Sequence, residues 1–225
     1  MAFDGITIAS IVREMKNQIE GGRIYKIAQP EKDELLLTIK NNGGQVRVIM
    51  SADASLPLLY LTQENKTSPM IAPNFCMLLR KHLQNARIVA VDQPMGLERI
   101  VKLQLEHLNE LGDLCTKYLV IELMGKHSNI IFTDADGMII DSIKHISHLV
   151  SSVREVLPGK AYVYPPSGDK RSPYDTDQDY FASSVYTKPV TVTKAIYTSV
   201  TGISPLIANE LCYRVGIDGG QSTAA

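Results

Sequence analysis

Alternation of apolar and polar residues predicts most of the strands in this chain. The clearest case is Val101, Leu103 and Leu105, which alternate with charged or polar residues, as in a strand with one buried and one wet face. Similar runs flank Asn41-Asn42-Gly43-Gly44, where Asn and Gly tolerate the backbone conformations of a hairpin turn. After this hairpin, five strands are expected, at Arg87–Val91, Arg99–Glu106, Lys117–Leu123, Asn129–Thr133 and Met138–Ile143, and the second of them contains Val101, Leu103 and Leu105.

Helical spacing of apolar residues predicts the helices. A first helix is expected over Ile8–Ile19, where it stops before two glycines. A second helix is expected over Asn74–Leu83, with Asn74 as its N-cap. After a Pro-, Asp- and Ser-rich loop, helical structure is expected to resume near Val190, and Ser204 is expected to cap a last helix.

These elements predict an α+β fold that contains an antiparallel β-sandwich with flanking helices. The last two helices, separated by a short turn with Gly202, have the outline of a helix-hairpin-helix unit. We therefore expect one α+β domain over residues 1–175, followed by the start of a helical region over residues 176–225.

Charge and composition restrict the class of protein. The chain has 23 basic and 24 acidic residues, a net charge of −1, so binding to nucleic acid would depend on a local patch. No apolar run approaches the ~18 residues of a membrane-spanning helix, and the N-terminus lacks the pattern of an export signal. The three cysteines form no CxxC pair, which fits a reducing cytoplasm.

Motifs for catalysis are missing from the sequence. The five histidines show no HExxH spacing, no GxSxG surrounds a serine, and no glycine-rich loop precedes a Lys-Ser or Lys-Thr pair. We therefore expect no catalytic residue, no metal and no cofactor.

Eight short sequence motifs follow one another along the chain. Each alone is weak evidence of kinship, but together they are specific for one protein family. They are Met1-Ala2-Phe3-Asp4-Gly5, Gly21–Ile24, Phe75–Leu83, Gly96–Val101, Glu122–Asn129, Ile140–His145, Val153–Gly159 and Thr201–Pro205. With these phrases the chain resembles the N-terminal domain of the NFACT family, the RqcH- and NEMF-like proteins. Since family members are usually much longer, the chain is interpreted as an N-terminal fragment.

The resemblance implies a fold like the N-domain of formamidopyrimidine DNA glycosylases. Those enzymes use an N-terminal Pro followed by Glu, whereas this chain begins Met1-Ala2-Phe3-Asp4, so glycosylase chemistry is not expected. The resemblance also implies tRNA binding at Glu98 and Arg99, where family members usually carry an Asp-Arg pair. Here the acid is one methylene longer.

The function implied by the resemblance is non-catalytic. The intact protein would bind a large ribosomal subunit that holds peptidyl-tRNA and would recruit tRNA for alanine tailing of the stalled chain. Further RNA contacts are expected from exposed basic residues, namely Arg80, Lys81, Lys126, His127 and Arg154. A fibronectin-binding adhesin is the alternative, and it requires export to the cell surface. A nucleic-acid repair enzyme is a third reading, which requires release of damaged bases.

Overall fold

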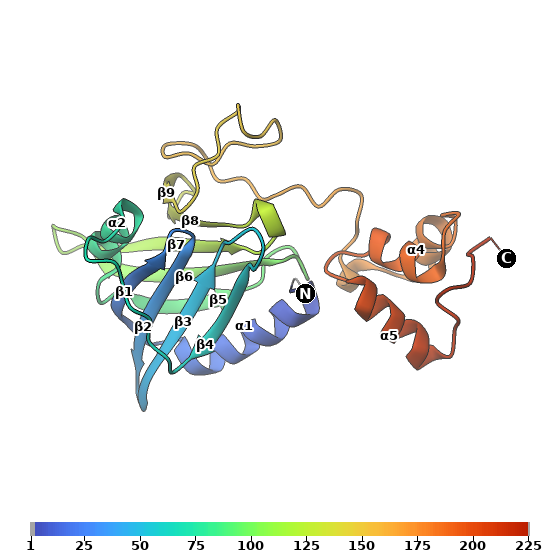
Figure 1. The fold of residues 1–225 in the computed structure, drawn as a ribbon, viewed down its shortest axis with the longest axis horizontal. Helices are drawn as coiled ribbons and strands as arrows, with labels where there is room; N and C mark the ends of the chain where they lie inside the picture. The colour runs from blue at the N-terminus through green and yellow to red at the C-terminus, as the bar shows by residue number, and fades with distance from the viewer. Residues whose placement is uncertain (1–2, 225) are drawn as a thin grey trace. The chain divides into compact units, whose positions relative to one another are not determined.

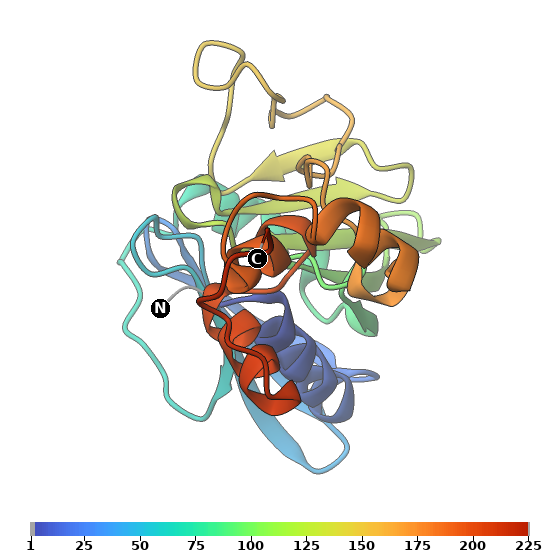
Figure 2. The same cartoon turned by 90° about the vertical axis from the view of Figure 1, so that its right-hand side faces the viewer.

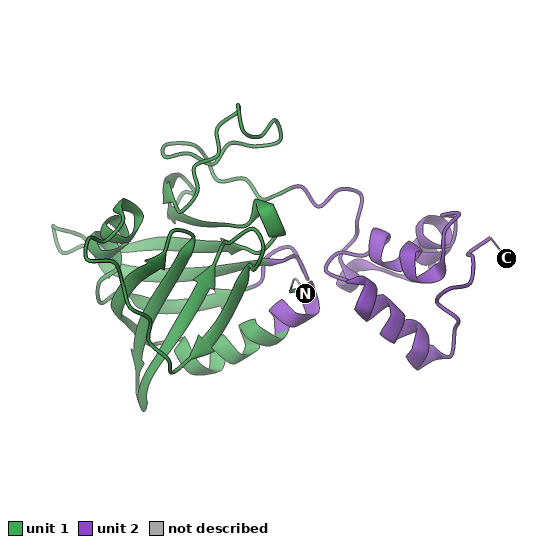
Figure 3. Cartoon of the chain, viewed as in Figure 1, with its two compact units in different colours: residues 1–3, 10–92, 100–165 green, residues 4–9, 93–99, 166–225 purple. Residues whose placement is uncertain are grey.

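The computed structural model describes residues 3–224, and these divide into two units (Figure 3). Unit 1 comprises Phe3, Ser10–Asp92 and Ile100–Pro165, and unit 2 comprises Asp4–Ala9, Gln93–Arg99 and the chain from Pro166 onward. Met1 and Ala2 of the first sequence phrase lie outside the described residues. The expected division at residue 175 differs from these units, because unit 2 already begins at Pro166 and also includes Asp4–Ala9 and Gln93–Arg99.

A nine-stranded antiparallel sheet dominates the described part of unit 1. Its order is β4-β3-β2-β1-β5-β6-β7-β8-β9. The strands are β1 (Arg23–Glu31), β2 (Glu34–Asn41), β3 (Gly44–Ser51), β4 (Leu58–Thr62), β5 (Arg87–Asp92), β6 (Ile100–Leu108), β7 (Leu114–Glu122), β8 (Asn129–Asp134) and β9 (Ile139–Ser142). The predicted α+β class and antiparallel pairing are confirmed.

The sheet is continuous but strongly bent where β1 meets β5. These two strands share a single register pair, Arg23 with Arg87, whereas β6 and β7 pair along their whole length. Figure 1 shows β1–β4, in blue to cyan, lying across the green strands of the other half. The predicted sandwich is therefore one sheet bent on itself.

Burial explains where the expected one-sided pattern holds and where it does not. Val101, Leu103 and Leu105 of β6 are buried, and their neighbours are partly exposed, as predicted. Strand β2 is instead buried on both faces through most of its length. The polar segment after β4 contacts β2, because its Lys66 ammonium lies 2.9 Å from Oε1 of Glu34, the first residue of β2.

Two helices belong wholly or partly to this unit. Helix α1 (Gly5–Ile19) starts three residues before the predicted helix, because Asp4 accepts a hydrogen bond from the Thr7 amide. Helix α2 (Asn74–Leu83) has the predicted bounds, but Pro73 occupies the N-cap position, so the expected Asn74 cap is wrong.

Unit 2 is mainly helical beyond Pro166. Helices α4 (Val192–Ser199) and α5 (Pro205–Val215) are joined by five residues, and Ser204 caps α5 as predicted (Figure 2). Helical structure begins earlier than the expected Val190, with the short helix α3 (Gln178–Tyr180) and a π-turn over Phe181–Val185. The Asp177 side chain caps α3 by accepting from the Tyr180 amide, a local signal within a segment expected to be a loop.

Candidate nucleic-acid interface

Glu98 and Arg99 lie in unit 2, at the end of a tight turn. The turn contains Met95 and Gly96, both with positive φ. The side-chain amide of Gln93, at the start of the turn, donates a hydrogen bond to the Glu98 backbone carbonyl at 2.9 Å. Glu98 is buried, and its carboxylate accepts a hydrogen bond from the Arg99 amide at 3.0 Å. Arg99 is half-buried, so part of this residue remains accessible to solvent, whereas the preceding acid is buried.

Close backbone approach positions this turn. A Cβ at Gly5 would lie 1.9 Å from the Leu97 carbonyl oxygen, and a Cβ at Gly202 would lie 2.1 Å from the same atom. The Gly5 amide also donates to the Gly202 carbonyl at 2.9 Å. Three segments that are far apart in sequence therefore meet at Leu97, one residue before Glu98.

Asp4 joins two helix N-termini at the same junction. One carboxylate oxygen accepts from the Thr7 amide at 2.8 Å, and the other accepts from the Ser204 hydroxyl at 2.6 Å. Partial burial would raise the pKa of Asp4, but the hydrogen bonds from Ser204 and Thr7 outweigh it and hold the pKa below its usual value. A fixed carboxylate thus stabilises the junction.

Lys170 and Lys188 are basic residues of this region that the sequence did not predict. Lys170 is an electrostatic neighbour of Glu98, Arg99 and Lys188, and all four belong to unit 2. No local pattern relates residue 170 to residue 99. Their proximity depends on backbone pairing between distant segments.

The other predicted basic residues lie in unit 1 and form no single patch. Lys81, on α2, lies 3.9 Å from Glu110 in the hairpin between β6 and β7, whereas Lys126 and His127 follow β7 at its other end. A nine-residue strand spans about 30 Å. The Arg80 Nε donates to the Ile27 carbonyl at 2.8 Å, which ties this side chain to β1.

The Arg154 side chain forms hydrogen bonds within unit 1. Its guanidinium donates to both carboxylate oxygens of the fully buried Glu122 and to the Val163 carbonyl, 2.7 Å away. Only 17% of the Arg154 side chain is exposed. These contacts give the Arg154 guanidinium a structural role, and its contact with RNA stays a prediction.

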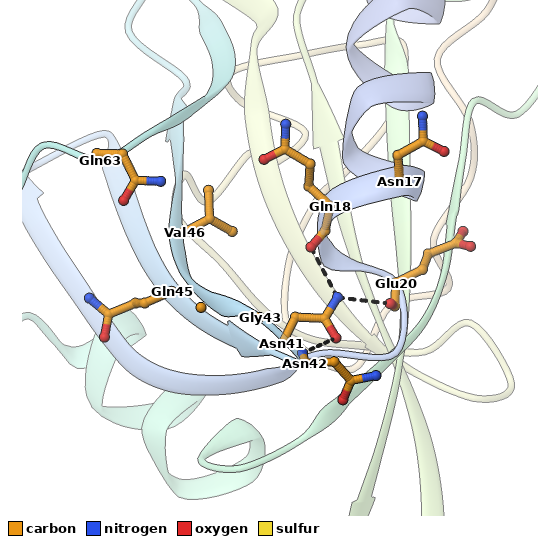
Figure 4. A pocket seen from close by; sticks show the side chains of 10 residues that line it. Asn17, Gln18, Glu20, Asn41, Asn42, Gly43, Gln45, Val46 and Gln63 are labelled. Atoms are coloured by element: carbon orange, nitrogen blue, oxygen red, sulfur yellow. Dashed lines mark hydrogen bonds between the residues drawn. The ribbon is translucent and has the colours of Figure 1, made fainter.

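A separate polar pocket of about 510 Å³ lies between the end of α1, the hairpin of β2 and β3, and Gln63 (Figure 4). Asn41 anchors its floor by donating to the carbonyls of Gln18 and Glu20. Most of the side chains that line it are neutral amides, and no Lys or Arg is among them. This lining does not suit a phosphate group.

Two structural features are absent from the described residues. No helix within residues 3–224 is long and apolar enough to cross a membrane. The same residues contain no group of three or more His, Cys, Asp or Glu side chains arranged to hold a metal ion.

Comparison with known proteins identifies the family to which this chain belongs. The sequence profile described as NFACT N-terminal and middle domains matches residues 4–225. The chain belongs to this NFACT family. Its relatives include the Rqc2 homolog RqcH of Bacillus subtilis (strain 168), 38% identical over 96% of this chain and 38% of the relative. The ribosome quality control complex subunit NEMF of Homo sapiens is 22% identical over 63% of this chain and 12% of that protein.

Solved structures of NFACT N-terminal domains share the fold. The N-terminal domain of fibronectin-binding protein PavA from Streptococcus pneumoniae has a TM-score of 0.86 and 35% identity, covering 96% of this chain and 80% of that chain. The N-terminal part of the fibronectin/fibrinogen-binding protein from Streptococcus suis has a TM-score of 0.87 and 33% identity, covering 97% and 81%. This chain spans about two fifths of the length of the RqcH relatives.

Proposed function

We propose that this chain is the tRNA-binding part of a cytoplasmic ribosome quality control factor and has no catalytic activity of its own. The observation that carries the proposal is the Glu98–Arg99 turn. Buried Glu98 and the contacts of Leu97 fix the backbone, and Arg99 remains partly exposed. A guanidinium held in this way offers a planar set of donors for a phosphate or a base edge.

The wider role rests on the family. Relatives are named as ribosome quality control factors, and we propose that the intact protein binds a large ribosomal subunit with peptidyl-tRNA and recruits tRNA for alanine tailing. Peptide transfer itself would belong to the ribosome, so this chain would position tRNA. The arrangement of α4, a turn with Gly202 at a φ of 75°, and α5 supports a helix-hairpin-helix unit.

The proposal is tested by tRNA binding of the expressed chain with Arg99→Ala. An Arg contact to RNA is worth ~1–3 kcal/mol, so we expect tRNA affinity to fall about ten- to hundredfold with a nearly unchanged melting curve. Arg13→Ala, on the exposed side of α1, is the matched control and should bind normally. Glu98→Asp restores the usual family residue and should have a mild effect.

Two results would reject this assignment. Normal tRNA binding by Arg99→Ala would exclude the contact, and loss of binding only through unfolding would make Arg99 a structural residue. Fibronectin binding is the alternative, because that name is carried by related structures. Capture of the chain on immobilised fibronectin, together with no affinity for tRNA, would favour the alternative.

A further inference from the structure

Backbone pairing fixes the segment that carries Lys170 within unit 2. The Arg171 amide donates to the Ser199 carbonyl at 3.0 Å, and the Thr201 amide donates to the Arg171 carbonyl at 2.9 Å. These bonds join residue 171 to the segment that leads into Gly202. Lys170 therefore sits next to a segment that contacts Leu97 and so helps to position the Glu98–Arg99 turn.

A second contact brings the same segment to the turn. A Cβ at Gly96 would lie 2.3 Å from the Ser172 hydroxyl oxygen, so residues 96 and 172 are in direct contact. Lys170 lies two residues before Ser172, and Glu98 lies two residues after Gly96. The two contacts together make Lys170 a neighbour of Glu98 and Arg99.

Lys188 adds a third cation. Its ammonium donates to the Thr198 carbonyl at 3.3 Å, one residue before the Ser199 that pairs with Arg171. Partial loss of hydration lowers the pKa of Lys170, and the positive charges of Arg99 and Lys188 lower it further, against the opposing effect of Glu98. Arg99 and Lys188 are thus both electrostatic neighbours of Lys170, as is the buried Glu98 carboxylate.

Arg171 keeps its positive charge, but a contact with an aromatic ring determines its position. Its guanidinium lies over the Tyr180 ring, 4.2 Å from the ring centre, in a cation–π contact. Lys170 is exposed, and no acidic side chain forms an ion pair with it or with Lys188 among the described residues. The three cations Arg99, Lys170 and Lys188 therefore outnumber the one acidic neighbour, Glu98.

We propose that Arg99, Lys170 and Lys188 form a phosphate-binding cluster that holds a backbone phosphate of the bound tRNA. The inference rests on the proposed function and assigns two further residues to the same site. A phosphate would balance the excess positive charge of the cluster, while the hydrogen bond from the Arg99 amide to Glu98 fixes the backbone of the turn. Because phosphate is common to every nucleotide, the two lysines contribute affinity without sequence preference.

The test is the salt dependence of tRNA binding. Each phosphate contact adds about 0.7–0.9 to the slope of log affinity against log salt concentration. We expect Lys170→Ala and Lys188→Ala each to reduce this slope by roughly that amount and to weaken low-salt binding about three- to tenfold. Lys194→Ala, an exposed lysine on α4, is the matched control and should leave the slope unchanged.

Conservative variants separate electrostatics from folding. Lys170→Arg keeps the charge and should retain the slope, whereas Lys170→Gln removes the charge with similar bulk and should lose it. Melting curves identify any variant that fails to fold.

The outcomes distinguish the two proposals. If the unmodified chain binds tRNA and both alanine variants keep its slope, the phosphate cluster is refuted while the proposed function stands. If the unmodified chain does not bind tRNA, the proposed function fails, and the cluster fails with it. Inorganic phosphate provides an independent readout, because bound phosphate must raise the Lys170 pKa measured by NMR.

Discussion

Removal of Arg154 should lower the free energy of unfolding, because Arg154 is the partner of the buried Glu122 carboxyl. Glu122 is fully buried, and the Arg154 guanidinium donates to both of its carboxylate oxygens. Arg154→Ala leaves this carboxyl without an ionic partner, and breaking a buried pair in this way costs about 3–5 kcal/mol. We expect a smaller loss of unfolding free energy at pH 8, about 2–2.5 kcal/mol, because the unpaired carboxyl takes up a proton instead of remaining charged.

The pH dependence follows from the protonation of Glu122. Burial raises the pKa of Glu122 to about 7, although Arg154 acts in the opposite direction. A carboxyl whose pKa is higher in the folded chain stabilises it fully below the ordinary value of 4.5, and this contribution is lost as the pH rises through 7. The loss amounts to about 1.4 kcal/mol per pH unit within that window.

Arg154→Ala raises the pKa of Glu122 further, because the cation that lowered it is gone. The carboxyl is then protonated in both proteins at pH 5, and the difference in unfolding free energy should shrink to about 1 kcal/mol, the value of a neutral hydrogen bond. At pH 8 the cost should be about twice as large, because between pH 7 and pH 8 only the variant continues to lose about 1.4 kcal/mol per pH unit.

Urea unfolding followed by circular dichroism measures both values, and it suits a chain that has no tryptophan. Arg13→Ala, which removes an exposed arginine, is the control and should change neither value. A loss of similar size at pH 5 and pH 8 would refute the argument from Glu122 protonation. If folded Arg154→Ala instead lowered the salt slope of tRNA binding, Arg154 would be an RNA contact after all.

Two further predictions concern the backbone. Gly202→Ala should lower the unfolding free energy by more than about 1 kcal/mol, because its φ is 75° and the new Cβ would meet the Leu97 carbonyl oxygen. Gly44→Ala, whose Cβ meets nothing within 4 Å, is the control in the same urea titration. Asn41→Ala should cost about 1 kcal/mol through the loss of its bonds to the last turn of α1. Asn42→Ala should cost less, and equal losses would contradict the role of the Asn41 amide.

The sequence predicted those elements whose local signals were strong. Strand β6 has a clear alternating pattern, and the Asn-Gly turn locates the hairpin of β2 and β3. Strand β1 was not predicted, because Lys26, Gln29 and Pro30 interrupt its apolar residues. Its place between β2 and β5 depends on distant strands, which local alternation does not describe.

The candidate site was predictable only in part, for a similar reason. Family phrases identified Glu98 and Arg99, which are adjacent in sequence. Lys170 was missed because it reaches them only through the contacts of residues 171 and 172. Arg154 was predicted to extend a basic RNA-binding patch, and its pairing with Glu122 at the end of buried strand β7 could not be read from the sequence, because 32 residues separate the two.

The junction at Leu97 has a consequence for the order of folding during synthesis. Asp4 and Gly5 leave the ribosome first, but Gly202 and Ser204, with which they form hydrogen bonds, are made about 200 residues later. At a synthesis rate of about 5–20 residues per second, the Glu98–Arg99 turn waits on the order of 5–20 s for these last partners. The residues proposed to bind tRNA therefore reach their final geometry only near the end of translation of this region.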